Sequence, residues 1–100
     1  MSKLPIQLKT REIKSFCEKH HIAYLALFGS VLTSHFTKKS DVDVLVKFEK
    51  KHIPHFFGLI QMESELSTII GYAVDLKTPN DLSRYFRDDV LAKAKTLYGK

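Results

Sequence analysis

The sequence has one cysteine, Cys17, and only 3 arginines among its 100 residues. A single cysteine excludes an internal disulfide and a zinc site built from several thiolates. No apolar stretch approaches the roughly 20 residues of a membrane span, and the first residues lack the apolar segment of a secretory signal. We therefore expect a protein of the reducing cytoplasm that is neither exported nor anchored.

The composition is that of an ordinary globular protein. Apolar residues make up 44% and charged residues 27% of the chain, and no biased tract or linker interrupts it. This predicts a single domain over residues 1–100 with one core. The formal charge of +5 comes mainly from scattered lysines, which indicates a solvated surface and favours an anionic substrate. Because arginine is not clustered, we do not expect direct nucleic-acid binding.

Helical spacing of apolar residues predicts helices at several places. Ile13, Phe16 and Cys17 predict an amphipathic helix over residues 10–20, in which Cys17 is a core residue. A second helix follows Pro54 and ends at Gly71, with an apolar stripe of Phe56, Leu59, Met62, Leu66, Ile69 and Ile70.

A last helical region is predicted after residue 77. Thr78, Pro79 and Asp81 have the spacing of a capping box with proline at the first helical position. The last helix is expected to carry the apolar residues Val90, Leu91, Ala94, Leu97 and Tyr98.

Three segments are typical of β-strands. Residues 22–28 form a nearly continuous apolar run closed by Gly29, as in a central strand buried on both faces. Residues 41–48 alternate, so Asp41 and Asp43 project from the same face. Residues 72–77 form a further short strand in which Asp75 interrupts an apolar run.

The order of these elements predicts an α/β fold, a small mixed β-sheet with helices packed on one face and the other face open. If the two aspartate-bearing strands are neighbours in matching register, Asp41, Asp43 and Asp75 meet on the open face. Charged carboxylates in strand interiors are costly unless a cation meets them. Hard oxygen ligands without histidine or cysteine select Mg²⁺ or Mn²⁺.

The Gly29-Ser30 pair after the central strand indicates a phosphate-binding turn. Glycine lets the backbone approach a ligand, the N–H groups of a following helical turn attract anions, and Ser30 adds a hydroxyl donor.

The whole pattern, G-S followed by ten residues and D-x-D, resembles the signature of polymerase-beta-type nucleotidyltransferases. The segments FGSVL, SDVDVLVKF, VDL and DLSRYFRDDVLAKA are similar to the minimal nucleotidyltransferases, or MNT domains. The resemblance implies the polymerase-beta-like fold. It assigns Asp41, Asp43 and Asp75 as ligands of two Mg²⁺ ions, with Asp75 as the base, and Gly29 and Ser30 as triphosphate contacts.

The resemblance also implies a function and a partner. MNT domains are typically antitoxins encoded beside a HEPN-domain toxin. The chain is thus expected to transfer AMP from ATP to a tyrosine hydroxyl of its HEPN partner and to form a hetero-oligomer with it.

Two other functions remain open. Many relatives carry arginine where this chain has Thr33, a change that removes a cation near the triphosphate and leaves room for an antitoxin that acts by binding alone. Transfer to a small molecule or an RNA end is a further alternative, although the chain has little room to hold such an acceptor.

Other residues that suggest chemistry have simpler interpretations. The histidine pairs His20-His21 and His52/His55 are interpreted as solvated surface, because adjacent positions do not face each other on a helix. Arg84 and Arg87 could contact phosphate or RNA, and a partner-docking surface or a structural turn is an equal alternative.

Overall fold

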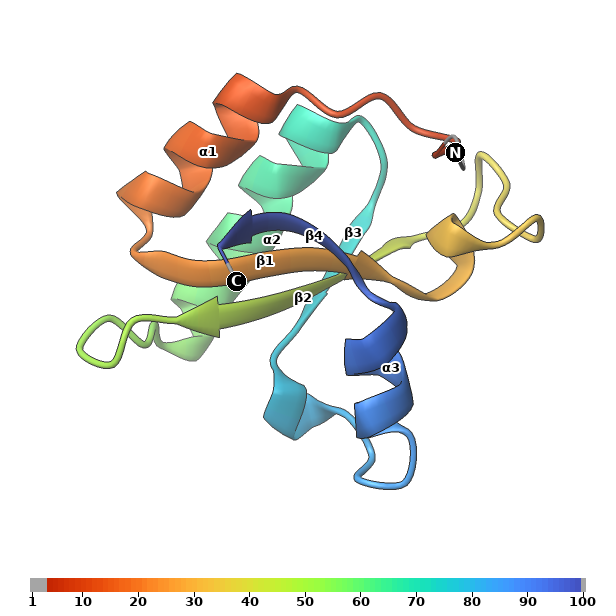
Figure 1. Ribbon diagram of the computed structural model, residues 1–100. Helices are drawn as coiled ribbons and strands as arrows, with labels where there is room; N and C mark the ends of the chain where they lie inside the picture. Colours follow the sequence, from red (N-terminus) through yellow and green to blue (C-terminus); the bar gives the residue numbers. More distant parts are fainter. Residues whose placement is uncertain (1–3, 100) are drawn as a thin grey trace.

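The chain folds around a four-stranded mixed β-sheet, shown in Figure 1. The computed structural model describes residues 4–99. The elements follow in the order α1 (Thr10–Lys19), β1 (Ile22–Phe28), η1 (Gly29–Leu32), β2 (Val42–Phe48), α2 (Phe56–Ile70), β3 (Val74–Lys77), η2 (Pro79–Asp81), α3 (Arg87–Lys93) and β4 (Lys95–Gly99).

The strand order across the sheet is β3-β2-β1-β4. β1 pairs antiparallel with β2 on one side and with β4 on the other. β2 and β3 pair in parallel, joined by α2 as the crossover that parallel neighbours require. The apolar run of β1 is therefore a central strand, and the expected mixed sheet is confirmed.

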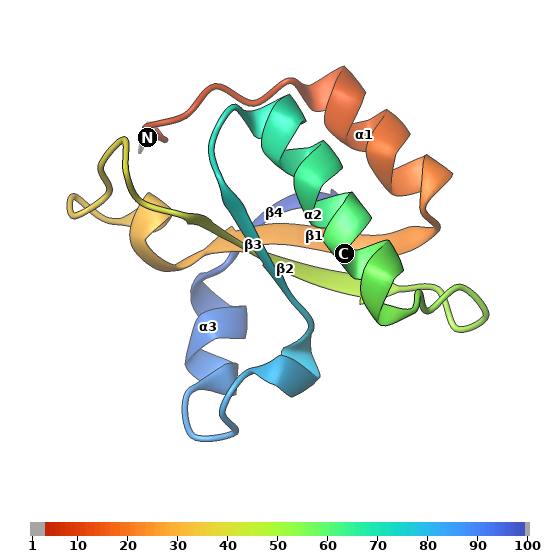
Figure 2. The same cartoon turned by 180° about the vertical axis from the view of Figure 1, so that it is seen from behind.

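α1 and α2 cover one face of the sheet. α1 lies above the strands in Figure 1, and α2 crosses β1 and β2, behind them in Figure 1 and in front of them in the reverse view of Figure 2. The main core lies here because α1 turns its apolar stripe inward and α2 does so with Met62, Leu66 and Ile70. Phe56 was predicted in the same stripe, but at the start of α2 its side chain is 70% exposed. It includes Phe16 and Cys17 of α1, Leu66 of α2, and the alternate strand residues Leu25, Leu27, Val42, Val44 and Val46.

The second face is only partly open, which corrects one expectation. α3 lies against it, below the sheet in Figure 1. A second cluster joins Tyr24, Ala26, Phe28, Leu45 and Leu82 to the α3 residues Val90 and Leu91 and to Ala94 just beyond it. The physical reason is already in β1, whose continuous apolar run needs cover on both faces.

The predicted last helix was wrong at its carboxyl end. α3 stops at Lys93, Ala94 has extended backbone angles, and Leu97 and Tyr98 belong to β4, from which they pack against the main core. The capping box at Thr78 and Asp81 is present, but it opens the short η2 turn and not a long helix. There the Asp81 Oδ2 atom accepts hydrogen bonds from the Thr78 backbone N–H and hydroxyl at 2.9 and 3.0 Å.

The outer side of β3 is capped by side chains of α2. Ser67 Oγ accepts a hydrogen bond from the Val74 N–H at 3.0 Å, and Glu63 Oε2 accepts one from the Leu76 N–H at 2.8 Å. Backbone N–H groups at a sheet edge otherwise need water or another strand. These two contacts fix β3 against α2 and so fix Asp75, which lies between them.

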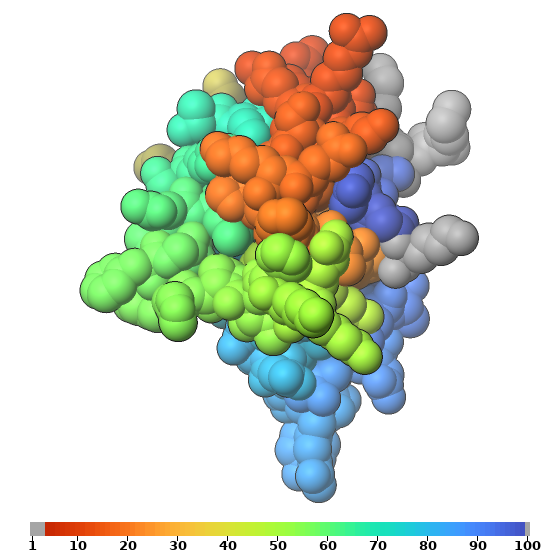
Figure 3. Space-filling model, turned by 90° about the vertical axis from the view of Figure 1, so that its left-hand side faces the viewer, coloured from red at the N-terminus to blue at the C-terminus, as the bar shows by residue number. Residues whose placement is uncertain are grey.

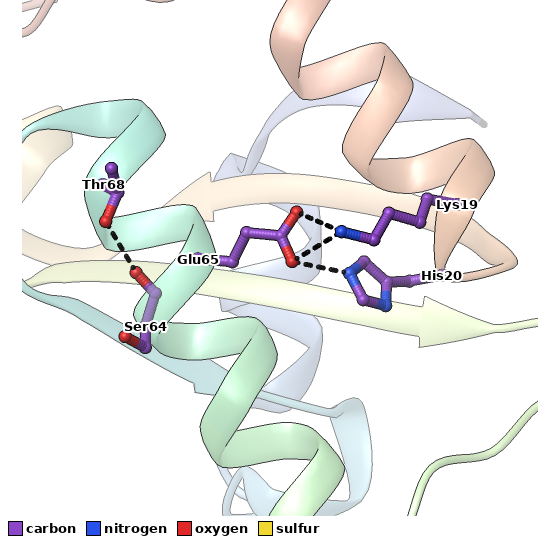
Figure 4. A network of polar contacts seen from close by, with 5 residues as sticks. All are labelled: Lys19, His20, Ser64, Glu65 and Thr68. Atoms are coloured by element: carbon purple, nitrogen blue, oxygen red, sulfur yellow. Dashed lines mark hydrogen bonds and ion pairs between the residues drawn. The ribbon is translucent and has the colours of Figure 1, made fainter.

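A polar bridge joins α1 to α2, as Figure 4 shows. Lys19 Nζ donates to both carboxylate oxygens of Glu65, at 3.2 and 3.1 Å, and His20 Nε2 lies 3.0 Å from Glu65 Oε1. Partial burial acts to raise the pKa of Glu65, but the hydrogen bonds from His20 and Lys19 outweigh it and hold the pKa below its ordinary value.

Within residues 4–99, no helix combines the length and the apolar character needed to cross a membrane.

Candidate active site

The parallel pairing of β2 and β3 sets two aspartates side by side. In the register of the two strands, Asp43 is the partner of Asp75, between the apolar pairs Val42/Val74 and Val44/Leu76. Because side chains alternate along both strands, these carboxylates project from the face opposite α1 and α2. Asp41 directly precedes β2, two residues from Asp43, and is exposed.

The negative charges of Asp75 and Asp41 both act on the Asp43 carboxylate. Its pKa is raised above the ordinary value, first because burial desolvates the carboxylate, then because Asp75 and, more weakly, Asp41 add negative charge. Lys77 acts in the opposite direction. A partly buried acid surrounded by two others is a site where a divalent cation would relieve the repulsion.

Gly29 lies directly against the Asp43 carboxylate. Phe28, the last residue of β1, pairs with Asp43 across the sheet, and Gly29 follows with φ of 78°. A methyl group at Gly29 would overlap Asp43 Oδ2 and lie 3.1 Å from its Cγ atom. Glycine is needed here for two reasons, its left-handed backbone and the close approach of the carboxylate.

Ser30 follows Gly29 in the turn η1. In η1, the Ser30 carbonyl accepts hydrogen bonds from the Thr33 N–H and hydroxyl, both at 2.9 Å. None of the side-chain hydrogen bonds among residues 4–99 uses the Ser30 hydroxyl, which leaves it available as a donor. Thr33 closes this turn.

A cavity of about 470 Å³ opens beside the turn. Its walls combine apolar side chains with polar groups from η1 and α3, namely Phe28, Gly29, Leu32, Thr33, Asp89, Val90 and Lys93. A second cavity of about 700 Å³ shares Leu32, Thr33 and Lys93 with it. Space for a ligand of small-molecule size therefore adjoins Gly29.

Lys77 is a site residue that the sequence analysis did not single out. Its Nζ atom lies 3.5 Å from Asp75 Oδ2, and both side chains are partly exposed. The signal was present, since alternation along β3 places residues 75 and 77 on the same face. Lys77 supplies a positive charge next to the acids from within the chain.

The three carboxylates are spread more widely than the ligands of a single ion. Among residues 4–99, the one group of three metal-ligating side chains whose atoms all lie within 4.8 Å of one another is elsewhere, at His21, Glu49 and His52. A pair of metal ions about 3.5–4 Å apart does not require the outer carboxylates to touch. The donor set of three aspartates, with Asp43 between the others, fits hard divalent ions in that arrangement.

This geometry, with a Gly-Ser turn against an aspartate of D-x-D and a third aspartate on the neighbouring parallel strand, is the arrangement that the resemblance to nucleotidyltransferases implies. Residues 11–100 match the family described as polymerase beta nucleotidyltransferase. The chain belongs to this family. Within it, the similar proteins include protein adenylyltransferases.

Two relatives illustrate the similarity. Protein adenylyltransferase MntA of Thermococcus cleftensis is 32% identical over 82 residues, which cover 82% of this chain and 81% of that protein. MJ1379 of Methanocaldococcus jannaschii is also 32% identical, over 65% of this chain and 65% of that protein, slightly under two thirds of its length.

Solved structures match the fold. A structure described as a minimal nucleotidyltransferase superposes with a TM-score of 0.70 at 27% identity, covering 86% of both chains. A toxin-antitoxin crystal structure with AMP-PNP gives a TM-score of 0.73 at 20% identity, covering 93% of this chain and 75% of that one. A Shewanella oneidensis complex of tri-AMPylated HEPN toxin with MNT antitoxin gives 0.64 at 19%, covering 91% and 70%. The minimal nucleotidyltransferase fold is confirmed.

Proposed function

We propose that this chain is a Mg²⁺-dependent protein adenylyltransferase. It transfers AMP from ATP to a tyrosine hydroxyl of a HEPN-domain toxin in the cytoplasm and so acts as the toxin's antitoxin. The observation that carries the proposal is the register of Asp43 with Asp75, with Gly29 pressed against the Asp43 carboxylate.

Asp41, Asp43 and Asp75 would hold two Mg²⁺ ions, or Mn²⁺ in their place. When bound, such ions supply activation of the attacking hydroxyl and charge neutralisation of the triphosphate and its leaving group. The pKa of Asp43 is raised, first by burial and then by its acidic neighbours, although Lys77 lowers it. The positive charge near the carboxylates therefore does not balance their negative charge, which supports a role in binding cations.

The remaining groups bind and orient the substrates. Backbone N–H groups at the start of η1 and the Ser30 hydroxyl donate to the triphosphate. Asp75 accepts the proton of the attacking tyrosine hydroxyl. The tyrosine oxygen then forms a bond to the α-phosphorus, the bond from that phosphorus to the bridging oxygen breaks, and pyrophosphate leaves.

The partner is proposed from the relatives. The HEPN toxin of the Shewanella oneidensis complex carries AMP groups beside its MNT antitoxin, and the Thermococcus cleftensis relative is named a protein adenylyltransferase. A hetero-oligomer with a HEPN toxin is the corresponding assembly here.

The test is incubation of the chain with ATP labelled at the α-phosphate, Mg²⁺ and the HEPN protein encoded beside it. Label should appear on the partner, and mass spectrometry should locate AMP on tyrosine. Asp41→Asn and Asp43→Asn should each abolish transfer, whereas Asp88→Asn, an exposed carboxylate of α3, should leave it unchanged. Absence of label with both Mg²⁺ and Mn²⁺ would refute the proposal.

A second function, antitoxicity by binding alone, is favoured by one observation. Thr33 brings no cation to the turn because its side chain is uncharged, and its hydroxyl donates to the Ser30 carbonyl. If this function holds, the Asp41→Asn/Asp43→Asn variant neutralises the toxin in cells as well as the parent chain does. If that variant no longer neutralises the toxin, the result supports adenylyl transfer and not binding alone.

A further inference from the structure

Three side chains with metal-ligating atoms converge at the end of the sheet away from the aspartates. His21 lies in the turn between α1 and β1, and Glu49 and His52 lie in the loop of residues 49–55 between β2 and α2. One ligand atom of each lies within 4.8 Å of the others, and His21 Nδ1 is 3.9 Å from Glu49 Oε1. All three side chains are exposed, so an ion can reach them from solvent.

This cluster is separate from the candidate active site. Ile22 pairs with Phe48 at one end of β1, and Phe28 pairs with Asp43 at the other. The two ends are six residue steps apart along β1, or roughly 20 Å. Figure 3 faces the histidine end, where the orange surface at the end of α1 and the yellow-green surface of the 49–55 loop lie against each other.

The backbone holds the three residues in place. The Glu49 N–H donates to the His21 carbonyl at 3.0 Å, and the His52 N–H donates to the Glu49 carbonyl at 2.9 Å. His21 is the one non-glycine residue of residues 4–99 with positive φ, at 54°. The imidazole rings of His21 and His52 are stacked, with centroids 3.7 Å apart and planes at 16°. The loop and the turn are thus tied together before any ligand arrives.

We propose that His21, Glu49 and His52 form a binding site for a borderline transition-metal ion, with Zn²⁺ as the probe ion. Two imidazoles and one carboxylate are a ligand set that Zn²⁺, Ni²⁺ and Cu²⁺ accept, whereas Mg²⁺ prefers oxygen ligands alone. Metal–ligand bonds of about 2.0–2.2 Å place tetrahedral ligand atoms roughly 3.4 Å apart, so the ligand atoms must move by about 1 Å. The stacked rings must also turn about their side-chain bonds so that one nitrogen lone pair of each points at the ion. Water completes the coordination.

The two histidines of the site are far apart in the sequence. The pairs that are close along the chain are His20-His21 and His52/His55, but the pair that meets in space takes one member from each. His20 instead contacts Glu65. The nearby Lys50 and Lys51 disfavour a cation through repulsion, so the binding depends on the imidazole ligands and not on net negative charge.

The test is calorimetric titration of Zn²⁺ into the full chain without a histidine tag. It is done in the Asp41→Asn/Asp43→Asn background, so that the aspartate site does not contribute. The expected stoichiometry is one ion per chain, with no heat from Mg²⁺. His21→Asn, which keeps a residue tolerant of positive φ, should weaken binding at least about tenfold, as should Glu49→Gln and His52→Ala.

His55→Ala and His35→Ala are the matched controls, since both are exposed histidines outside the cluster, and both should titrate as the background does. Circular dichroism checks that each variant is folded. In nuclear magnetic resonance spectra, Zn²⁺ should shift the ring signals of His21 and His52 and leave those of His55 in place. The proposal would be refuted if the Asp41→Asn/Asp43→Asn protein did not bind Zn²⁺, or if adding His21→Asn or His52→Ala to it left the affinity unchanged.

Discussion

At the scale of single residues, Gly29 links the backbone conformation of the turn to the position of a candidate catalytic carboxylate. Its positive φ and its contact with the Asp43 carboxylate are two independent demands on the same position. A residue with a Cβ atom would be strained in the left-handed backbone, and its Cβ would have to displace the carboxylate.

Gly29→Ala is therefore expected to reduce adenylyl transfer by about 100-fold or more, because a shift of about 1 Å in a reacting group has that effect. The left-handed backbone adds about 1–2 kcal/mol of destabilisation. Steady-state rates and urea unfolding measure the two effects. Gly71→Ala, at a positive φ with open space around it, is the control that should lose stability but keep its rate. A fully active Gly29→Ala variant would contradict the proposed geometry.

Asp43→Asn should increase the stability of the metal-free protein while it abolishes transfer. A raised folded pKa means that ionisation of Asp43 opposes folding, so this penalty is absent at low pH and appears as pH rises above the unfolded value near 3.8. We expect a gain of a few tenths to about 1 kcal/mol at pH 7 and none at pH 3. Urea unfolding at both pH values with excess chelator measures it, and a less stable variant at pH 7 would contradict the assignment.

At the scale of secondary-structure elements, the position of Asp75 depends on α2. Ser67 and Glu63 accept hydrogen bonds from backbone N–H groups on either side of it. A helix on one face of the sheet thus controls a carboxylate that projects from the other face.

Ser67→Ala should destabilise the protein by about 1 kcal/mol, because the Val74 N–H loses its acceptor. It should also lower the transfer rate by loosening β3. Thr68→Ala is the control, since the Thr68 hydroxyl donates to the Ser64 carbonyl within the same helix (Figure 4). Chemical unfolding and rate measurements should separate the two variants, and equal behaviour would show that the cap of β3 is unimportant.

The bridge between α1 and α2 should make stability depend on pH. The lowered pKa of Glu65 means that its ionised form favours folding, a contribution present above the unfolded value of about 4.5 and lost as pH falls through the folded value. Because Lys19 and Glu65 are 64% and 35% exposed, we expect only about 0.5 kcal/mol. Unfolding of the parent and of Glu65→Gln should differ at pH 7 and converge at pH 3. A difference that persists at pH 3 would point to packing instead.

At the scale of the whole molecule, Mg²⁺ and ATP should stabilise the folded chain. A ligand at 100 times its dissociation constant adds about 2.7 kcal/mol. Thermal unfolding should therefore shift upward with both ligands present, and ATP with chelator should give a smaller shift. The Asp41→Asn/Asp43→Asn variant should show no metal-dependent shift, and a shift equal to the parent's would place the ions elsewhere.

Much of this molecule could be predicted from the sequence because its signals are local. Alternation in β2 and the apolar run of β1 define the strands, and Asp41 and Asp43 follow from that alternation. A parallel β2-α2-β3 unit then brings Asp75 into register with Asp43. The roles of these residues and of Gly29 and Ser30 as ligands and contacts stay predictions, as does the single domain over residues 1–100.

The parts that were missed depend on contacts between distant segments. Leu97 and Tyr98 continue the helical spacing of Val90, Leu91 and Ala94, yet they form β4 because β1 offers them a pairing partner some 70 residues earlier in the chain. Local spacing cannot report such a partner. The meeting of His21 with His52 has the same cause, since it requires the end of β2 to return to the start of β1.

The arrangement of α2 along β3 has a consequence for association with other polypeptides. Ser67 and Glu63 accept the outward N–H groups of β3, so this edge strand lacks the free donors that pairing with a further strand needs. Extension of the sheet by main-chain pairing is therefore directed to the other edge strand, β4. Extension at one edge alone permits edge-to-edge pairs of chains but not continuous ribbons.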